Sequence, residues 1–268
     1  MDLGINGKIA LVTGSHRGTG LIIGQQLAKE GVRVIFHGLT AADAKALTAQ
    51  LSNNECDLAD IVWGDISTEV GSTQVVDAVK KRTDHIDILV NNYGTAAPGR
   101  WQSTSTEDWI DSYQRNALAG LRMAQSFSPM MRQRGWGRIV HLGTVGSTRP
   151  NKVSPQYYAA KGALANMNVG LAQELSDTGI TVNLVSPGLI RTAEVEQAYL
   201  TKAIKAGWGD TFESAESMIV KEYAPNPLGR MATREEVADV VVFACSQRAS
   251  FINGQNIRVD GGALGIVQ

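Results

Sequence analysis

Cysteine is scarce in this chain, which has only two among its 268 residues, Cys56 and Cys245. Neither has a second cysteine or a histidine at the spacing of a zinc site, and two distant cysteines form no disulfide framework. The sequence therefore predicts two reduced thiols, no metal site, and a cytoplasmic protein.

The chain also lacks an excess of charge of either sign. It has 25 basic and 26 acidic residues, which give a formal net charge of -1. Such a balance gives no electrostatic reason to expect a nucleic-acid partner. The first residues lack the apolar core of a signal peptide, and no run of about 18 apolar residues predicts a membrane span. No internal repeat, low-complexity segment or Pro/Gly-rich linker divides the chain. We expect one domain over residues 1–268, with no membrane or nucleic-acid partner.

Hydrophobic residues make up 43% of the chain, enough for a sizeable core. Short runs rich in Val, Ile and Leu alternate with helical patterns, which is typical of buried parallel strands covered by helices. The fold class is therefore α/β, a doubly wound Rossmann-type sheet of seven parallel strands with helices on both faces. The predicted strands are 9–13, 33–36, 60–63, 86–90, 138–142, 181–185 and 255–259.

A glycine-rich turn follows the first predicted strand and reads TGSHRGTG, residues 13–20. A helix over 19–30 comes next, and Gly31 is placed to end it. Glycines permit a tight turn and close backbone approach to a pyrophosphate, and the helix N-terminus attracts phosphates. A merely flexible loop is the alternative, but a strand before and a helix after favour nucleotide binding.

Tyr157 and Lys161 lie four residues apart on a predicted helix, so both side chains share one face. Lowering the pKa of a tyrosine from about 10 to about 7 takes roughly 4 kcal/mol, which a cation about 4 Å away supplies at an effective dielectric near 20. We therefore expect Lys161 to lower the pKa of Tyr157 and make it a general acid or base. Tyr158 lies about 100° further round the helix and does not share that face.

The glycine turn and the Tyr157/Lys161 pair together resemble the short-chain dehydrogenase/reductase family over nearly the whole chain, with 3-oxoacyl-[acyl-carrier-protein] reductases the most similar type. The resemblance implies an NAD(P)-dependent oxidoreductase that interconverts a ketone and a secondary alcohol by hydride transfer. It also implies a small-molecule carbonyl or alcohol substrate and a homo-oligomer, a tetramer or a dimer. The alternative is an inactive nucleotide-binding regulatory or interaction protein of the same fold.

The family pattern also implies the residues of the site. Its catalytic positions fall on Asn116, Thr144, Tyr157 and Lys161. Thr144 stands where the family usually has Ser, and Asn116, within a helix over 107–134, is expected to distort that helix and hold a water. The positions implied for the cofactor are Gly14, Ser15, Arg17, Gly18, Thr19, Gly20, His37, Asp65, Ile66, Asn92, Gly94, Tyr157, Lys161, Pro187, Gly188, Ile190 and Thr192.

The choice of coenzyme depends on the end of the second strand. An acidic residue there would favour the ribose 2′-hydroxyl of NAD, but position 38 is glycine. Arg17 in the glycine turn could meet the 2′-phosphate of NADP, with His37 and Thr40 as polar neighbours, or be a solvated loop cation. We expect NADP(H) to be favoured over NAD(H).

Two further features leave alternatives open. Tyr93 replaces the alanine of the family's Asn-Asn-Ala-Gly segment, and its ring could cover the cofactor or point to a neighbouring helix. Residues 193–223 correspond to the family's substrate lid, with Trp208 as an apolar wall between hinge glycines. A surface excursion used for assembly is the alternative for that region.

Overall fold

The computed structural model describes residues 1–52 and 59–266, so Cys56 lies outside the described residues. The described part contains a seven-stranded sheet in the order β3-β2-β1-β4-β5-β6-β7, and every neighbouring pair is parallel. The strands are β1 (Ile9–Val12), β2 (Arg33–Gly38), β3 (Ala59–Trp63), β4 (Ile88–Asn91), β5 (Gly137–Leu142), β6 (Ile180–Pro187) and β7 (Asn256–Val259). The predicted doubly wound α/β sheet is confirmed. Its order reverses between β1 and β4, where a cleft for ligands forms at the carboxyl ends of the strands.

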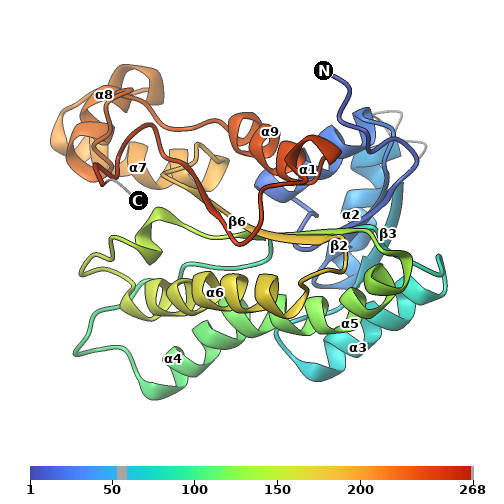
Figure 1. The fold of residues 1–268 in the computed structure, drawn as a ribbon. Coiled ribbons are helices and arrows are strands. Elements are labelled where there is room, and N and C mark those ends of the chain that lie inside the picture. The colour runs from blue at the N-terminus through green and yellow to red at the C-terminus, as the bar shows by residue number, and fades with distance from the viewer. Residues whose placement is uncertain (53–58, 267–268) are drawn as a thin grey trace.

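Helices cover both faces of the sheet (Figure 1). One face carries α3 (Glu69–Lys80), α4 (Thr106–Tyr113), α5 (Ala119–Arg134) and α6 (Pro155–Glu174). The other carries α1 (Gly18–Lys29), α2 (Ala41–Ser52), α7 (Ala193–Ala206), α8 (Phe212–Tyr223) and α9 (Arg234–Ala244). Because alternate residues of a strand point to opposite faces, Ala10 and Val12 join one apolar core while Ile9 and Leu11 join the other.

Local sequence signals set the ends of several helices. Gly31 has a left-handed φ of 77° directly after the residue that caps α1, as expected of a glycine there. Thr233 and Glu236 form a capping box at the start of α9. No helix in the described part of the chain is long and apolar enough to cross a membrane.

Two expected helical regions are interrupted. The predicted helix over 107–134 consists of α4, a π-helical turn (Gln114–Leu118) and α5. Residues 193–223 form α7 and α8, and Gly207 ends α7 with a left-handed φ of 70°. These two helices bury a small apolar cluster of their own, which includes Phe212 and Ile219, and Trp208 packs against it. Trp208 therefore contributes to the packing of this region.

Candidate functional site

The glycine turn leaves the N-terminus of α1 open to an anion. Helix α1 begins at Gly18, its N-cap residue Arg17 makes no side-chain cap, and no acidic residue lies in its first turn. A Cβ added to Gly20 would lie 2.4 Å from Asn92 Nδ2, so only glycine lets the helix approach the strand ends this closely. Unsatisfied N–H groups and the helix dipole favour a phosphate here. These residues fit the diphosphate of a dinucleotide.

Asn92 holds the turn in place. Its Nδ2 donates to the Thr13 carbonyl at 3.0 Å and to the Gly14 carbonyl at 3.1 Å. Gly14 itself has a φ of 60° and would place an added Cβ 3.0 Å from the Tyr93 Cα. Positive φ and a close neighbour together explain a glycine at this position.

His37, which was expected to lie beside the cofactor, packs against the glycine turn as a buried side chain. Its side chain is fully buried, Nδ1 accepts from the Gly14 N–H at 2.9 Å, and Nε2 donates to the Gly64 carbonyl at 2.9 Å. Burial lowers the pKa of His37 to about 4. A neutral imidazole with both nitrogens engaged offers no cation to a phosphate.

Arg17, in contrast, is accessible. Two thirds of its side chain is exposed, and Nη1 contacts Glu194 Oε1 at 2.9 Å. Glu194 lies in the first turn of α7, so this ion pair joins the glycine turn to the 193–223 region. An exposed pair of this kind contributes little stability, and it leaves Arg17 available to another anion.

The ends of β3 and β4 place two further predicted residues. Asp65 is partly buried and its Oδ1 accepts from the Ser67 N–H at 3.0 Å and hydroxyl at 2.6 Å, while Ile66 is buried. Tyr93 packs in the core on the α3/α5 face, and its hydroxyl accepts from Arg115 Nη1 of the π-helical turn at 3.4 Å. Of the two alternatives for Tyr93, the structure supports the one in which it points to a neighbouring helix.

Lys161 and Asn116 meet beside Gly94. A Cβ added to Gly94 would lie 2.7 Å from Asn116 Oδ1 and 3.0 Å from Lys161 Nζ, so both groups face one point and leave room only for glycine. Lys161 is 3% exposed, and Nζ donates to the Leu142 carbonyl at 2.7 Å. Burial lowers the pKa of Lys161 to about 8.

Asn116 lies in the π-helical turn, which confirms the expected distortion of its helix. Its Oδ1 accepts from the Thr95 N–H at 2.9 Å, and its Nδ2 donates to the carbonyls of Thr95 and Ser112, each at 3.0 Å. Asparagine is unfavourable within a helix unless its amide has such partners. The amide therefore joins the π turn to the segment after β4.

Tyr157 differs from expectation in its acidity. Burial and, to a smaller extent, the neighbouring Tyr158 raise the pKa of Tyr157 to about 12, although a hydrogen bond with Thr144 opposes the shift. The expected lowering by Lys161 is wrong, because the long side chain of Lys161 reaches the Leu142 carbonyl and burial dominates the environment of Tyr157. The phenol stays protonated at neutral pH, in contact with the hydroxyl of Thr144.

The carboxyl end of β6 brings the remaining predicted residues to the same edge of the sheet. The Gly188 N–H donates to the Val259 carbonyl at 2.9 Å, directly after Pro187. A Cβ on Gly188 would lie 3.2 Å from the Asp260 Cα. After Ile190, Thr192 caps α7 by accepting from the Val195 N–H at 3.3 Å, and its hydroxyl donates to the carboxylate of Glu194.

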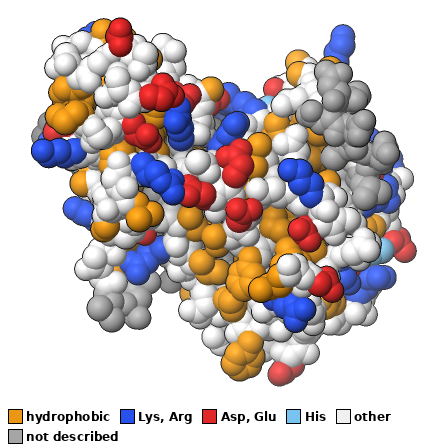
Figure 2. Space-filling view, turned by 90° about the horizontal axis from the view of Figure 1, so that it is seen from above, with side chains coloured by type: hydrophobic (Ala, Val, Ile, Leu, Met, Phe, Trp, Pro, Cys, Tyr) orange, Lys and Arg blue, Asp and Glu red, His pale blue; other side chains and the backbone are white. Residues whose placement is uncertain are grey.

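A cavity of about 340 Å³ lies between the β5–α6 connection and the helices of the 193–223 region. Its walls include Thr144 and three tyrosines, Tyr158, Tyr199 and Tyr223. The Tyr158 hydroxyl accepts from Asn151 Nδ2 at 3.0 Å. Sequence reasoning missed these tyrosines, because their spacing along the chain gives no sign that they share one cavity. Figure 2, which views the molecule from above, shows acidic and basic side chains intermixed on that face.

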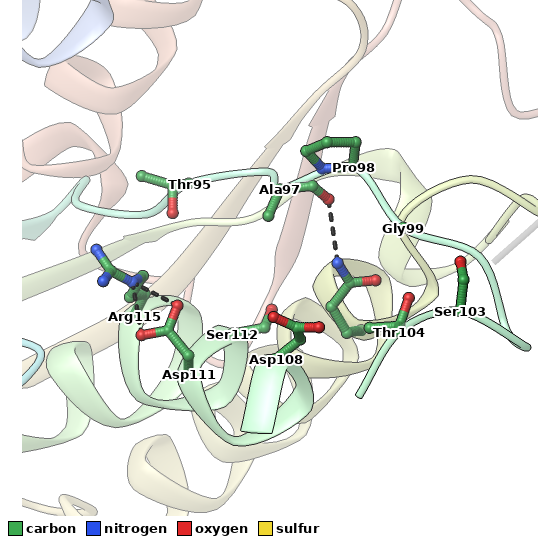
Figure 3. Close-up of a pocket in the computed structure, with 11 residues that line it drawn as sticks. Thr95, Ala97, Pro98, Gly99, Ser103, Thr104, Asp108, Asp111, Ser112 and Arg115 are labelled. Carbon is green, nitrogen blue, oxygen red and sulfur yellow. Dashed lines mark hydrogen bonds and ion pairs between the residues drawn. The ribbon is translucent and has the colours of Figure 1, made fainter. Parts of the chain in front are cut away.

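A second, polar cavity of about 150 Å³ lies between α4 and the segment after β4 (Figure 3). Thr95 and Ser112, which hold the Asn116 amide, both line it. Gln156 Nε2 donates to the Ala97 carbonyl at 3.1 Å, and its buried Oε1 has no partner within residues 1–52 and 59–266. Asn116 thus lies between the buried ammonium of Lys161 and a polar opening. Within the same described residues, no group of three His, Cys, Asp or Glu side chains could hold a metal ion.

Comparison with known proteins shows the family to which the chain belongs. A family model described as Enoyl-(Acyl carrier protein) reductase matches residues 14–263. The chain is 34% identical to the 3-oxoacyl-[acyl-carrier-protein] reductase FabG of Aquifex aeolicus, over 98% of this chain and 99% of that protein. It is 31% identical to FabG of Escherichia coli, over 97% of this chain and 98% of that protein.

Solved structures of reductases have the same fold over nearly the whole chain. L-Sorbose reductase from Gluconobacter frateurii, complexed with NADPH and L-sorbose, superimposes with a TM-score of 0.92 at 31% identity, and all of each chain is covered. A 3-oxoacyl (acyl-carrier-protein) reductase from Agrobacterium tumefaciens C58 with NADP bound gives a TM-score of 0.85 at 28% identity, covering 97% of this chain and 96% of that one.

Proposed function

Because the chain belongs to the short-chain dehydrogenase/reductase family and is an oxidoreductase of the kind that acts on ketones and alcohols, we propose that Tyr157 is its general acid and base. The observation that carries this proposal is the presence of two pairs of polar groups after the carboxyl ends of β4 and β5. Tyr157 contacts the Thr144 hydroxyl, and Lys161 and Asn116 meet beside Gly94.

The roles follow from burial and hydrogen bonding. The nicotinamide ring, when bound, supplies or accepts the hydride. Thr144 and Tyr157 donate hydrogen bonds to the carbonyl oxygen, and the protonated phenol passes its proton to the developing alkoxide. A phenol with a pKa of about 12 holds that proton at neutral pH, which suits the direction of ketone reduction. Lys161 and Asn116 belong to the polar groups that return a proton to Tyr157 after it has protonated the alkoxide.

We propose NADP(H) as the favoured coenzyme, held at the open N-terminus of α1. Arg17 supports this choice, since it is the accessible cation of the glycine turn. The similar L-sorbose reductase and the similar Agrobacterium reductase were solved with NADPH and NADP respectively. Assembly into a dimer or tetramer and a cytoplasmic location remain predictions from the sequence.

We propose a small hydroxylated ketone as the substrate class. Three tyrosines and Asn151 line the cavity beside Thr144, and a mixture of aromatic faces and hydrogen-bonding groups suits a polyol chain. Similarity to L-sorbose reductase across the full chain agrees with this class. A 3-oxoacyl thioester is the second candidate, because the FabG proteins are equally similar in sequence.

The test is a panel of ketoses, simple ketones and 3-oxoacyl thioesters, each followed through absorbance of NADPH and of NADH. Turnover of ketoses with NADPH supports the proposal, and turnover of the thioester alone supports the second candidate. Binding of the coenzyme without turnover of any ketone would contradict the proposed activity and favour an inactive nucleotide-binding protein.

A further inference from the structure

A carboxylate does lie at the end of β2, although position 38 is glycine. Asp43, in the first turn of α2, directs Oδ2 back to the strand end, where it accepts from the Leu39 N–H at 3.1 Å and the Thr40 N–H at 2.9 Å. The Thr40 hydroxyl also donates to Oδ2 at 2.9 Å. The sequence has no acidic residue directly after β2, but Asp43 in the first turn of α2 places a carboxylate there.

Asp43 takes the space that a side chain at position 38 would occupy. A Cβ added to Gly38 would lie 2.8 Å from the Asp43 Cβ and 3.2 Å from the Ala44 nitrogen. The glycine at position 38 is therefore required by the fold, and its presence says nothing about which coenzyme the protein prefers. The charge at this point comes from Asp43.

The other carboxylate oxygen faces the glycine turn. Asp43 Oδ1 lies 4.0 Å from His16 Nε2, and 29% of the Asp43 side chain is exposed. Partial burial raises the pKa of Asp43, but the hydrogen bonds from Thr40 outweigh that effect and the net shift is downward. Asp43 is therefore ionised at neutral pH, between the end of β2 and the turn that holds the coenzyme.

We infer that Asp43 is a specificity-determining residue for the coenzyme, a point that rests on the proposed function. In a doubly wound fold the adenosine ribose lies between the glycine turn and the end of the second strand. A carboxylate there accepts from a 2′-hydroxyl and repels a 2′-phosphate. Asp43 thus favours NAD(H) while Arg17 favours NADP(H), and the two charges together keep discrimination by the wild-type protein small.

The experiment compares two ligands that differ only in the 2′-phosphate, adenosine 2′,5′-bisphosphate and AMP. Calorimetry on the full chain gives both dissociation constants, and titration with NADP⁺ and NAD⁺ repeats the comparison. The variant Asp43→Asn removes the charge and keeps an oxygen that accepts from Leu39 and Thr40. Asp43→Gln is a second variant, since a neutral glutamine also serves at the third position of a capping box.

Asp108→Asn is the matched control. Asp43 and Thr40 form a capping box, in which the Asp43 N–H donates to Thr40 Oγ1 at 3.1 Å. Asp108 occupies the same position in the capping box of α4, accepts from the Ser105 N–H at 3.0 Å, and lies on the opposite face of the sheet from α2. We expect both Asp43 variants to raise the preference for the bisphosphate over AMP about tenfold, while the control stays within about twofold of wild type.

Two results would overturn the inference. If folded Asp43 variants keep the wild-type preference within about twofold, Asp43 has no role in selection, while turnover of ketones would still stand. If the wild-type chain binds neither NADP⁺ nor NAD⁺, the proposed function fails together with the inference.

Discussion

Acid should destabilise this protein through His37. Burial lowers the pKa of His37 from its ordinary value of 6.5 to about 4 in the folded protein, where the neutral imidazole accepts from the Gly14 N–H. Stability from a group with a lowered folded pKa is complete above pH 6.5 and is lost as the pH falls toward 4. At about 1.4 kcal/mol per pKa unit, His37 alone accounts for a loss of about 3 kcal/mol.

The assay is urea unfolding at pH 7 and at pH 4.5, analysed by linear extrapolation. His141 is equally buried with a pKa of about 4, so wild type should lose stability from both histidines. The variant His37→Gln will be less stable at pH 7, because it changes a buried hydrogen-bonded group. Its further loss on acidification should be smaller than the wild-type loss by about 2–3 kcal/mol.

The comparison separates His37 from the general effect of acid on carboxylates. Both proteins keep the same acidic residues, so their contribution cancels in the difference between the two pH dependences. An identical loss of stability in wild type and His37→Gln would refute the argument that His37 is held neutral beneath the glycine turn.

Three predictions concern the reacting groups. Tyr157→Phe should remove most turnover and leave the dissociation constant of NADP⁺ within about twofold; normal turnover would disprove the acid–base role. Thr144→Ser keeps the hydroxyl and should retain or increase activity in the same ketone assay, and complete loss would show that the methyl group is needed. Gly94→Ala pushes a Cβ against Asn116 and Lys161 and should lower kcat about 100-fold, or about 3 kcal/mol in the barrier. An unchanged kcat would show that their alignment is not required.

The sequence by itself determined the architecture and supplied the residues that we propose as reacting groups. All seven strands were predicted to within about two residues at most ends, because strands buried on both faces read as short apolar runs. The cap of α9 and the glycine after α1 were predicted for a similar reason, since each depends on residues a few positions apart. Family resemblance then supplied Asn116, and the π-helical turn around it confirmed the expected distortion.

The tertiary structure decided how charged and polar those groups are. Tyr157 and Lys161 share a helix face, but burial is the main cause of both pKa shifts, and burial cannot be read from their spacing. His37 was expected at the cofactor and instead lies beneath the turn. Asp43 reaches the end of β2 from the next helix. Spacing along the chain reports which residues share an element, whereas desolvation and long-range partners depend on what packs against that element.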